Sequence, residues 1–187
     1  MGLVIKEIKC EDQEILDEAL KLLNNSQGDG LFPNDFLIRK IENRNAIVLI
    51  AWLDDVFVSV ATAEILSDLH YYKPFDRSIE SRCQGKKVGS IYTSSVADRY
   101  RGRGIGQAMT RYRLNWLENR GCEIALGISW LSGLEHTSKR VFEKLGFKAV
   151  SKVDRFFRDH TNQDPFECPG CEVHPCECSA ILYEWQF

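Results

Sequence analysis

The glycine-rich segment from residue 96 to residue 107 restricts the fold more than any other part of this sequence. It reads Val-Ala-Asp-Arg-Tyr-Arg-Gly-Arg-Gly-Ile-Gly-Gln, with a strand-like apolar stretch before it and an amphipathic stretch after it. A strand-to-helix turn leaves several backbone N–H groups unpaired at the positive end of a helix. Because glycines let a ligand approach that backbone closely, the segment predicts an anion site suited to a pyrophosphate.

Two well-known phosphate motifs do not match this turn. A P-loop ends in Gly-Lys-Ser/Thr, which is absent, and the dinucleotide fingerprint has a glycine where this chain has Gln107. The remaining alternative is a tight turn that binds no ligand.

Apolar periodicity predicts strands and helices along the rest of the chain. The expected strands are residues 3–9, 46–52, 56–66, 88–96, 123–128, 147–157 and 179–187, with a hairpin turn at Asp54-Asp55. The expected helices run from Asp12 to about residue 27 and over about 35–42, 105–119 and 134–145. The third helix carries an apolar stripe of Ile105, Ala108, Met109, Tyr112 and Trp116.

The order of these elements predicts the fold class. Antiparallel strands come first, a polar and irregular stretch follows over 67–87, and strands then alternate with helices. This order predicts one mixed α/β (α+β) domain, 1–187, with a central mixed sheet flanked by helices.

Charge and hydropathy narrow the expected partners. The net charge is -3 and no long run of one sign occurs, so neither nucleic acid nor a membrane surface is expected as partner. We find no secretory signal and no apolar stretch near the ~20 residues that a membrane span needs. A cytoplasmic protein, monomer or homodimer, is expected.

Two motifs resemble those of the GNAT acetyltransferase family. Arg101-x-x-Gly104-x-Gly106 resembles that family's Arg/Gln-x-x-Gly-x-Gly/Ala pattern, and Val96 stands where the family has an apolar strand end. Residues 138–147, Ser-Lys-Arg-Val-Phe-Glu-Lys-Leu-Gly-Phe, look like the family's late helix and its Gly-Phe exit. The resemblance covers about residues 88–157 well and the N-terminal third only in element order.

The resemblance implies the GNAT acyl-CoA N-acyltransferase fold and a function. An acetyl group would pass from acetyl-CoA to a primary amine, a small molecule or a protein amine, by direct attack in a ternary complex. By resemblance, the coenzyme would be bound by Ser94, Ser95, Val96, Arg101, Gly102, Arg103, Gly104, Ile105, Gly106, Gln107, Ser138 and Phe142.

The catalytic residues depart from the family pattern. Ser90 stands where some members have a glutamate base, and Phe142 where many have a tyrosine acid. Glu135 replaces an asparagine often found on the late helix. The substitute catalytic candidates are Glu64 and Tyr92, with His136 and Ser138 near the helix start. Three of them also have a structural explanation: Glu64 as a solvated strand end, Tyr92 as a core aromatic and His136 as a surface histidine.

Four of the seven cysteines form a cluster before the last expected strand. Cys168, Cys171, Cys176 and Cys178 fall within eleven residues, in the spacing Cys-x-x-Cys and Cys-x-Cys. This pattern predicts a structural zinc site in an insertion at about 158–179, with His174 and His160 as alternate ligands. By resemblance, that insertion borders the acceptor site. Disulfides or free thiols are the alternatives.

Two other functions remain open from the sequence. The chain could be a CoA-binding module that has lost catalysis, which the missing glutamate and tyrosine favour. It could also be a zinc-stabilised protein-interaction domain, which the cysteine cluster favours. The other cysteines, Cys10, Cys83 and Cys122, are expected to be reduced and at least partly buried.

Overall fold

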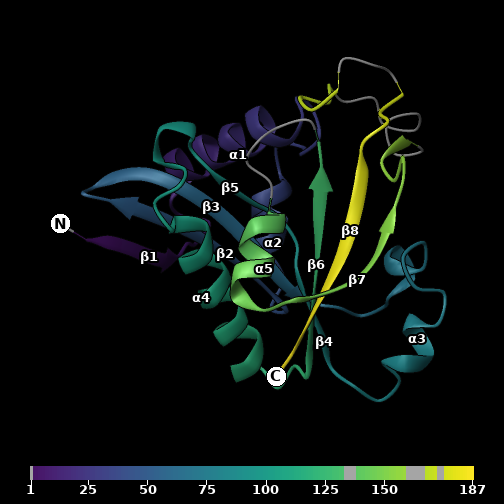
Figure 1. Ribbon diagram of the computed structural model, residues 1–187. Coiled ribbons are helices and arrows are strands. Elements are labelled where there is room, and N and C mark those ends of the chain that lie inside the picture. Colours follow the sequence, from purple (N-terminus) through teal and green to yellow (C-terminus); the bar gives the residue numbers. More distant parts are fainter. Residues whose placement is uncertain (1, 133–137, 159–166, 172–174) are drawn as a thin grey trace.

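The computed structural model describes residues 2–132, 138–158, 167–171 and 175–187 (Figure 1). Its strands form one sheet in the order β1-β2-β3-β4-β6-β8-β7, with β5 paired to β3. The strands are β1 (Leu3–Glu7), β2 (Ala46–Leu53), β3 (Val56–Ile65), β4 (Val88–Ile91), β5 (Ser94–Val96), β6 (Ile124–Leu131), β7 (Lys148–Val153) and β8 (Ser179–Gln186). Among these described pairings, β4 with β6 is parallel and the others are antiparallel. The predicted mixed sheet is confirmed.

Helices cover both faces of this sheet. They are α1 (Gln13–Gln27), α2 (Phe36–Glu42), α3 (Ile79–Arg82), α4 (Ile105–Asn119) and α5 (Lys139–Leu145), with 3-10 turns η1 (His70–Tyr72) and η2 (Asp98–Tyr100). Figure 1 shows α4 and α5 together on one face, and α1 on the other. Residues 133–137, the start of the predicted last helix, lie outside the described residues. Of the helices described, none has the length and hydropathy to cross a bilayer.

Side chains of β2 alternate between the two apolar layers, as strand geometry requires. Val48 and Ile50 pack in the cluster that contains α1 and α2. Ile47 and Leu49 pack in the cluster that contains α4. Because both faces of this strand are buried, its sequence is continuously apolar instead of alternating.

The connection between β3 and β4 is more ordered than predicted. Its side chains Tyr72, Phe75 and Ile79 are buried in a cluster with residues of β6 and β8. The expectation of an irregular polar stretch over 67–87 is therefore wrong in part. A helix of four residues, such as α3, is too short for periodicity to reveal it.

The predicted strand over 88–96 is broken in two, and the break splits the sheet. β4 pairs with β6 only as far as Ile91, which lies opposite Gly127. Beyond that point, among the described strands, β5 pairs with β3 and the rest of β6 pairs with β8. The two central strands therefore separate at Tyr92 and Thr93. The predicted strand 147–157 also ends early, at Val153.

Helix α4 has the predicted bounds but a different buried face. Ile105 and Met109 are buried as predicted, whereas Tyr112 is exposed. The buried face continues instead through Thr110, Arg113, Leu114 and Leu117. The predicted stripe followed apolar residues, so it missed two polar residues that are buried under the site.

Candidate active site

Two cavities meet where the central strands separate. The larger, of about 680 Å³, lies on the side of α1 and α2, and the smaller, of about 380 Å³, lies on the side of α4 and α5. The residues that line both are Gln27, Ile91, Tyr92, Thr93, Ile128 and Trp130. The split therefore connects the two faces of the sheet through one opening.

The glycine-rich turn forms the rim of the smaller cavity. Gly102 and Gly104 have φ angles of 77° and 82°, a left-handed backbone that favours glycine. Gly104 is the N-cap of α4, so the N–H groups of Ile105, Gly106 and Gln107 lie in the first turn, where a helix supplies no acceptor. A Cβ at Gly106 would lie 3.5 Å from Val141 Cγ2, an ordinary contact that fits the Gly/Ala pattern.

The two arginines of the turn differ in position. Arg101 lines the smaller cavity, and its guanidinium donates to the carbonyl of Val96 at 3.1 Å and pairs with Asp98 at 2.8 Å. This side chain therefore holds the turn in shape. Arg103 is exposed, and its guanidinium lies 5.4 Å from the ring centroid of Tyr100 instead of lining the cavity.

The smaller cavity is electropositive. Among the described residues that line it, none is Asp or Glu, and the charged ones are Arg101, Arg113, Arg140 and Lys144. Free N–H groups of a first helical turn add to this positive potential. The cavity is therefore suited to an anion such as a phosphate group.

The coenzyme residues predicted from β5 and the late helix also lie here. Ser94, Ser95 and Val96 line the cavity, and β5 pairs with β3 at one edge only, within the part of the chain that the structure describes. Ser138 lines the cavity as well. Phe142 also lines the cavity, although it is only 3% exposed, because most of its ring packs against Gly127 and Tyr183 in the apolar core.

Gln27 and Arg113 hold the break in the strand, and neither residue was predicted from the sequence. The Gln27 amide donates to Thr93 Oγ1 at 2.6 Å and to Ser95 Oγ at 3.0 Å. The Arg113 guanidinium donates to the carbonyl oxygens of Thr62 and Thr93, each at 3.2 Å. These bonds join α1 and α4 to the point where the sheet opens.

Arg113 carries its charge deep in the protein. Its residue is 2% exposed, and burial lowers its pKa to about 9, so the guanidinium is still protonated at neutral pH. A helical wheel drawn from Met109 through Leu117 would have placed Arg113 on the buried face. Gln27 likewise follows the buried Leu23 by four residues on α1, but the sequence does not show which partners, more than 60 residues away, it would bind.

Glu64 lies beside the position that the resemblance gave to a catalytic glutamate. In the register of β3 and β4, Glu64 is the direct partner of Ser90. Cross-strand partners point to the same face, so this carboxylate lies on the side of the larger cavity, where Ser90 Oγ is 2.7 Å from Tyr72 Oη. Lys40 Nζ contacts Glu64 Oε2 at 2.5 Å, and the two side chains are 17% and 18% exposed. Glu64 is therefore a paired carboxylate and not a freely solvated strand end.

Tyr92 lies in the opening between the two cavities. It is 45% exposed, so the explanation as a core aromatic is wrong. The Lys40 ammonium lies 4.7 Å from its ring centroid. Burial of the hydroxyl, and next the negative charge of Glu64, raise the pKa of Tyr92, so the phenol keeps its proton up to alkaline pH.

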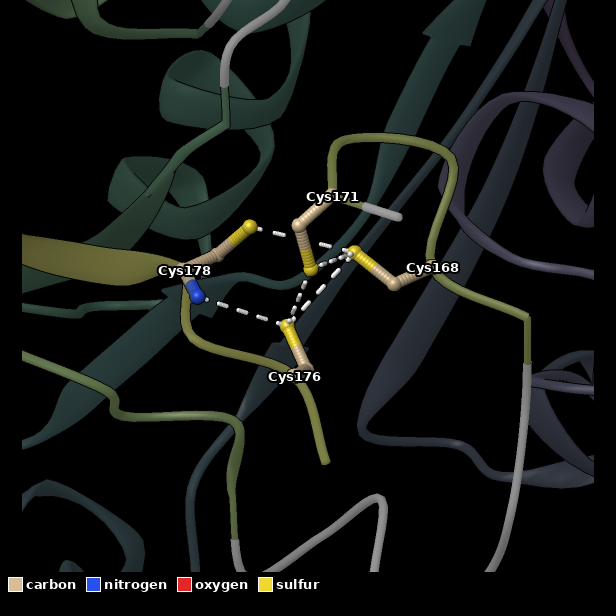
Figure 2. Close-up of side chains that lie close together, drawn as sticks. All are labelled: Cys168, Cys171, Cys176 and Cys178. Carbon is tan, nitrogen blue, oxygen red and sulfur yellow. Dashed lines mark hydrogen bonds between the residues drawn. The ribbon is translucent and has the colours of Figure 1, made fainter. Parts of the chain in front are cut away.

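The cysteine cluster forms one site at the end of the larger cavity. Cys168, Cys171, Cys176 and Cys178 have their ligand atoms within 4.8 Å of one another, and Figure 2 shows the sulfur atoms pointing toward each other. No disulfide joins the seven cysteines, all of which lie in the described residues, and this argues against the disulfide alternative. Cys83 and Cys122 are buried as expected, whereas Cys10 is exposed, so the expectation of burial is wrong for Cys10. The predicted alternates His174 and His160, and also His136 and Glu135, lie outside the described residues.

Comparison with known proteins agrees with this geometry. The model of the acetyltransferase (GNAT) family matches residues 13–147. No curated protein is significantly similar to the chain in sequence. An arylalkylamine N-acetyltransferase-like 5b protein from mosquito superposes with a TM-score of 0.70 at 14% identity, over 100% of both chains. The polyamine N-acetyltransferase of Drosophila melanogaster superposes with a TM-score of 0.67 at 12% identity, again over 100% of both chains.

One similar structure was determined with the coenzyme. A GNAT acetyltransferase from Elizabethkingia anophelis with acetyl-CoA bound has a TM-score of 0.65 at 13% identity, over 99% of this chain and 98% of that one. The split sheet and the glycine-rich turn thus define an acyltransferase-type fold. This chain belongs to the acetyltransferase (GNAT) family.

Proposed function

We propose that this protein is an N-acetyltransferase that moves an acetyl group from acetyl-CoA to a primary amine by direct attack in a ternary complex. The observation that carries the proposal is the opening through the split sheet, with an electropositive cavity on one side and an aromatic cavity on the other. Two substrates can approach from opposite faces and meet at Tyr92.

The coenzyme is assigned to the smaller cavity. First-turn N–H groups from Ile105 to Gln107, with the cations of that cavity, suit its diphosphate. The open edge of β5 suits the amides of its pantetheine arm, as an added strand would be paired. A backbone N–H of β5 is proposed as the donor to the developing oxyanion.

The acid, Tyr92, is assigned to the opening, and the base, Glu64, to the position next to it, opposite Ser90. At pH 7 only about one alkyl amine in a thousand is neutral, since such amines have a pKa near ~10. Glu64 accepts the proton that the amine nitrogen loses, through a water molecule, as the new N–C bond forms. Tyr92 protonates the leaving sulfur as the C–S bond breaks and recovers its proton from solvent. Its raised pKa keeps the phenol in the acid form that this role needs.

The acceptor is proposed to be an amine on an aromatic or apolar body. The larger cavity is lined by the aromatic residues Phe32, Phe36, Tyr71, Tyr72, Tyr92, Trp130 and Phe157. Its described lining contains Arg39 and Lys40 but no Asp or Glu. A polyamine carries further ammonium groups, which this lining would leave unpaired, whereas aromatic side chains favour an aryl group.

Acetyl-CoA as cosubstrate and a structural zinc ion complete the proposal. Cysteines without disulfides are typical of a reducing compartment, so we expect the protein in the cytoplasm. We propose one domain that acts as a monomer or homodimer.

The test has two stages. Calorimetry with acetyl-CoA should show binding at one site; no binding at millimolar coenzyme would reject the family activity for this chain. CoA release is then measured with 2-phenylethylamine, spermidine and agmatine. We expect kcat/KM for phenylethylamine to be at least about tenfold higher than for spermidine or agmatine. This ratio corresponds to roughly 1.4 kcal/mol in transition-state binding. Binding of acetyl-CoA without release on any amine would favour the catalytically impaired module, since Phe142 supplies no acid.

A further inference from the structure

The turn that carries the first two cysteines is packed tightly against the end of β6. A Cβ placed on Gly170 would lie 2.2 Å from Ser132 Cβ and 2.7 Å from Trp130 Cζ2. No side chain fits at such distances, so only glycine allows this approach. The Cys168–Cys171 turn is thereby attached to one wall of the opening.

The four sulfur atoms have the spacing of a tetrahedral metal site. Cys168 Sγ lies 3.3 Å from Cys171 Sγ, 3.5 Å from Cys176 Sγ and 3.8 Å from Cys178 Sγ. Cys171 Sγ lies 3.6 Å from Cys176 Sγ. A disulfide requires about 2.05 Å, whereas sulfurs at about 2.3 Å from one zinc ion lie about 3.8 Å apart.

Nearby N–H groups are directed at these sulfurs. The backbone N–H of Cys178 donates to Cys176 Sγ at 3.4 Å, and the backbone of Glu177 donates to Cys171 (Figure 2 shows the first). The indole N–H of Trp130 donates to the sulfur of Cys178. Such donors stabilise the negative charge of metal-bound thiolates and orient them.

The same cluster connects the two sides of the larger cavity. Cys168 and Cys176 line that cavity directly, and Trp130 lines it from β6. On the opposite side, the backbone N–H of Glu167 donates to the carbonyl of Asp29, just after α1, at 3.3 Å. In Figure 1 this segment lies at the end of the sheet where β6 ends and β8 begins.

We propose that Cys168, Cys171, Cys176 and Cys178 bind one Zn²⁺ as four thiolates, and that the metal site holds the wall of the acceptor cavity in place. Four ligands leave no open position on the ion, so its role is structural. Ordering irregular backbone costs conformational entropy, and metal binding offsets that cost. The metal site is inferred from the geometry of the four sulfurs alone, whereas its effect on the acceptor depends on the proposed acetyltransferase function.

Metal analysis tests the site. Full-length protein purified without added metal should contain about one equivalent of zinc per chain. Cys171→Ser should lose most of it, and the matched control Cys10→Ser, at an exposed cysteine outside the cluster, should keep it. Cobalt substituted for zinc should show the visible d–d bands and thiolate charge-transfer bands of a tetrahedral tetrathiolate. Less than about half an equivalent of metal, iron in place of zinc, or an octahedral cobalt spectrum would overturn the assignment.

Kinetics test the coupling to the acceptor. Gly170→Ala keeps all four sulfurs but displaces the turn from Trp130, so we expect bound zinc with an acceptor KM raised at least about fivefold, roughly 1 kcal/mol. The Kd for acetyl-CoA, measured by calorimetry, should change less than about twofold, because the coenzyme is assigned to the other cavity.

Trp130→Phe, which removes the indole N–H, should release zinc to a chelator faster than the unaltered chain does. If Gly170→Ala binds zinc with unchanged acceptor KM, the coupling is rejected and the metal site stands. If the unaltered protein binds no acetyl-CoA, the proposed function fails independently of the zinc content.

Discussion

Single residues define the turn that is proposed to bind the coenzyme. Gly104 has a φ angle of 82°, and a Cβ there would meet no atom within 4 Å. Its replacement is therefore strained by the backbone and not by crowding, at a cost of about 1–2 kcal/mol. The strain falls on the residue from which α4 begins, so it moves the N–H groups that face the cavity.

Gly104→Ala should weaken acetyl-CoA binding about five- to tenfold, since displaced N–H groups lose contact with the anion. Calorimetry measures the Kd. The matched control is Gly85→Ala, which has a φ angle of 77°, equally open surroundings and a position away from both cavities. Both variants should lose similar stability in urea. An equal loss of coenzyme affinity in both would show that the effect is global.

Glu64→Gln should lower kcat by about 10²–10⁴-fold, because an amide cannot accept the amine proton. The Kd for acetyl-CoA should stay the same, because Glu64 does not line the cavity assigned to the coenzyme. The control is Glu80→Gln, which also removes a carboxylate paired with a lysine, Lys73 at 2.9 Å, but on the surface of α3. If kcat in Glu64→Gln equals that of the control, Glu64 is not the base.

At the scale of elements, the site depends on a break in one strand. Gln27 from α1 and Arg113 from α4 bind the backbone and side chains at Thr93 from opposite faces of the sheet. Both residues continue the buried faces of their helices, but they bind this point through polar groups. Hydrogen bonds, and not hydrophobic packing, therefore fix where the sheet opens.

Gln27→Leu should lower the free energy of unfolding by about 1–3 kcal/mol, because it leaves the hydroxyls of Thr93 and Ser95 without this partner. We also expect higher KM values for both substrates, since the break borders both cavities. Urea unfolding and steady-state kinetics measure these effects. Gln13→Leu, on the exposed part of the same helix, is the control, and equal effects in both variants would contradict a special role for Gln27.

At the scale of the whole molecule, buried tyrosines make stability depend on alkaline pH. Burial raises the pKa of Tyr72 above the ordinary value of 10.0 and that of Tyr183 to about 12. Above pH 10 the unfolded chain loses these protons while the folded chain keeps them. The unfolded state therefore binds fewer protons, and the free energy of unfolding falls as pH rises through 10.

Urea titrations at several values from pH 8 to pH 11 test this expectation. The fall in stability above pH 10 should be shallower in Tyr72→Phe, although that variant is less stable at pH 8 because it loses the bond to Ser90. The exposed Tyr112→Phe is the control and should follow the unaltered protein. A pH profile that is identical in all three proteins would show that the tyrosines do not cause the fall.

Local signals in the sequence were sufficient for much of the fold. The hairpin at Asp54-Asp55 was predictable because two polar turn residues connect two apolar strands, and the structure gives both a positive φ angle. The bounds of α4 follow from the glycines that flank it. The cysteine cluster was found because its ligands are close together in the sequence.

The sequence by itself determined the elements whose partners lie nearby along the chain: the glycine-rich turn, α4 and the Cys-x-x-Cys turn. Only the tertiary structure decided where the sheet splits, that Glu64 lies opposite Ser90, and that Gln27 and Arg113 meet at Thr93. The physical reason is that helical periodicity shows which residues are buried but not which distant residues they bind. These hydrogen bonds form only when packing brings separate helices and strands together.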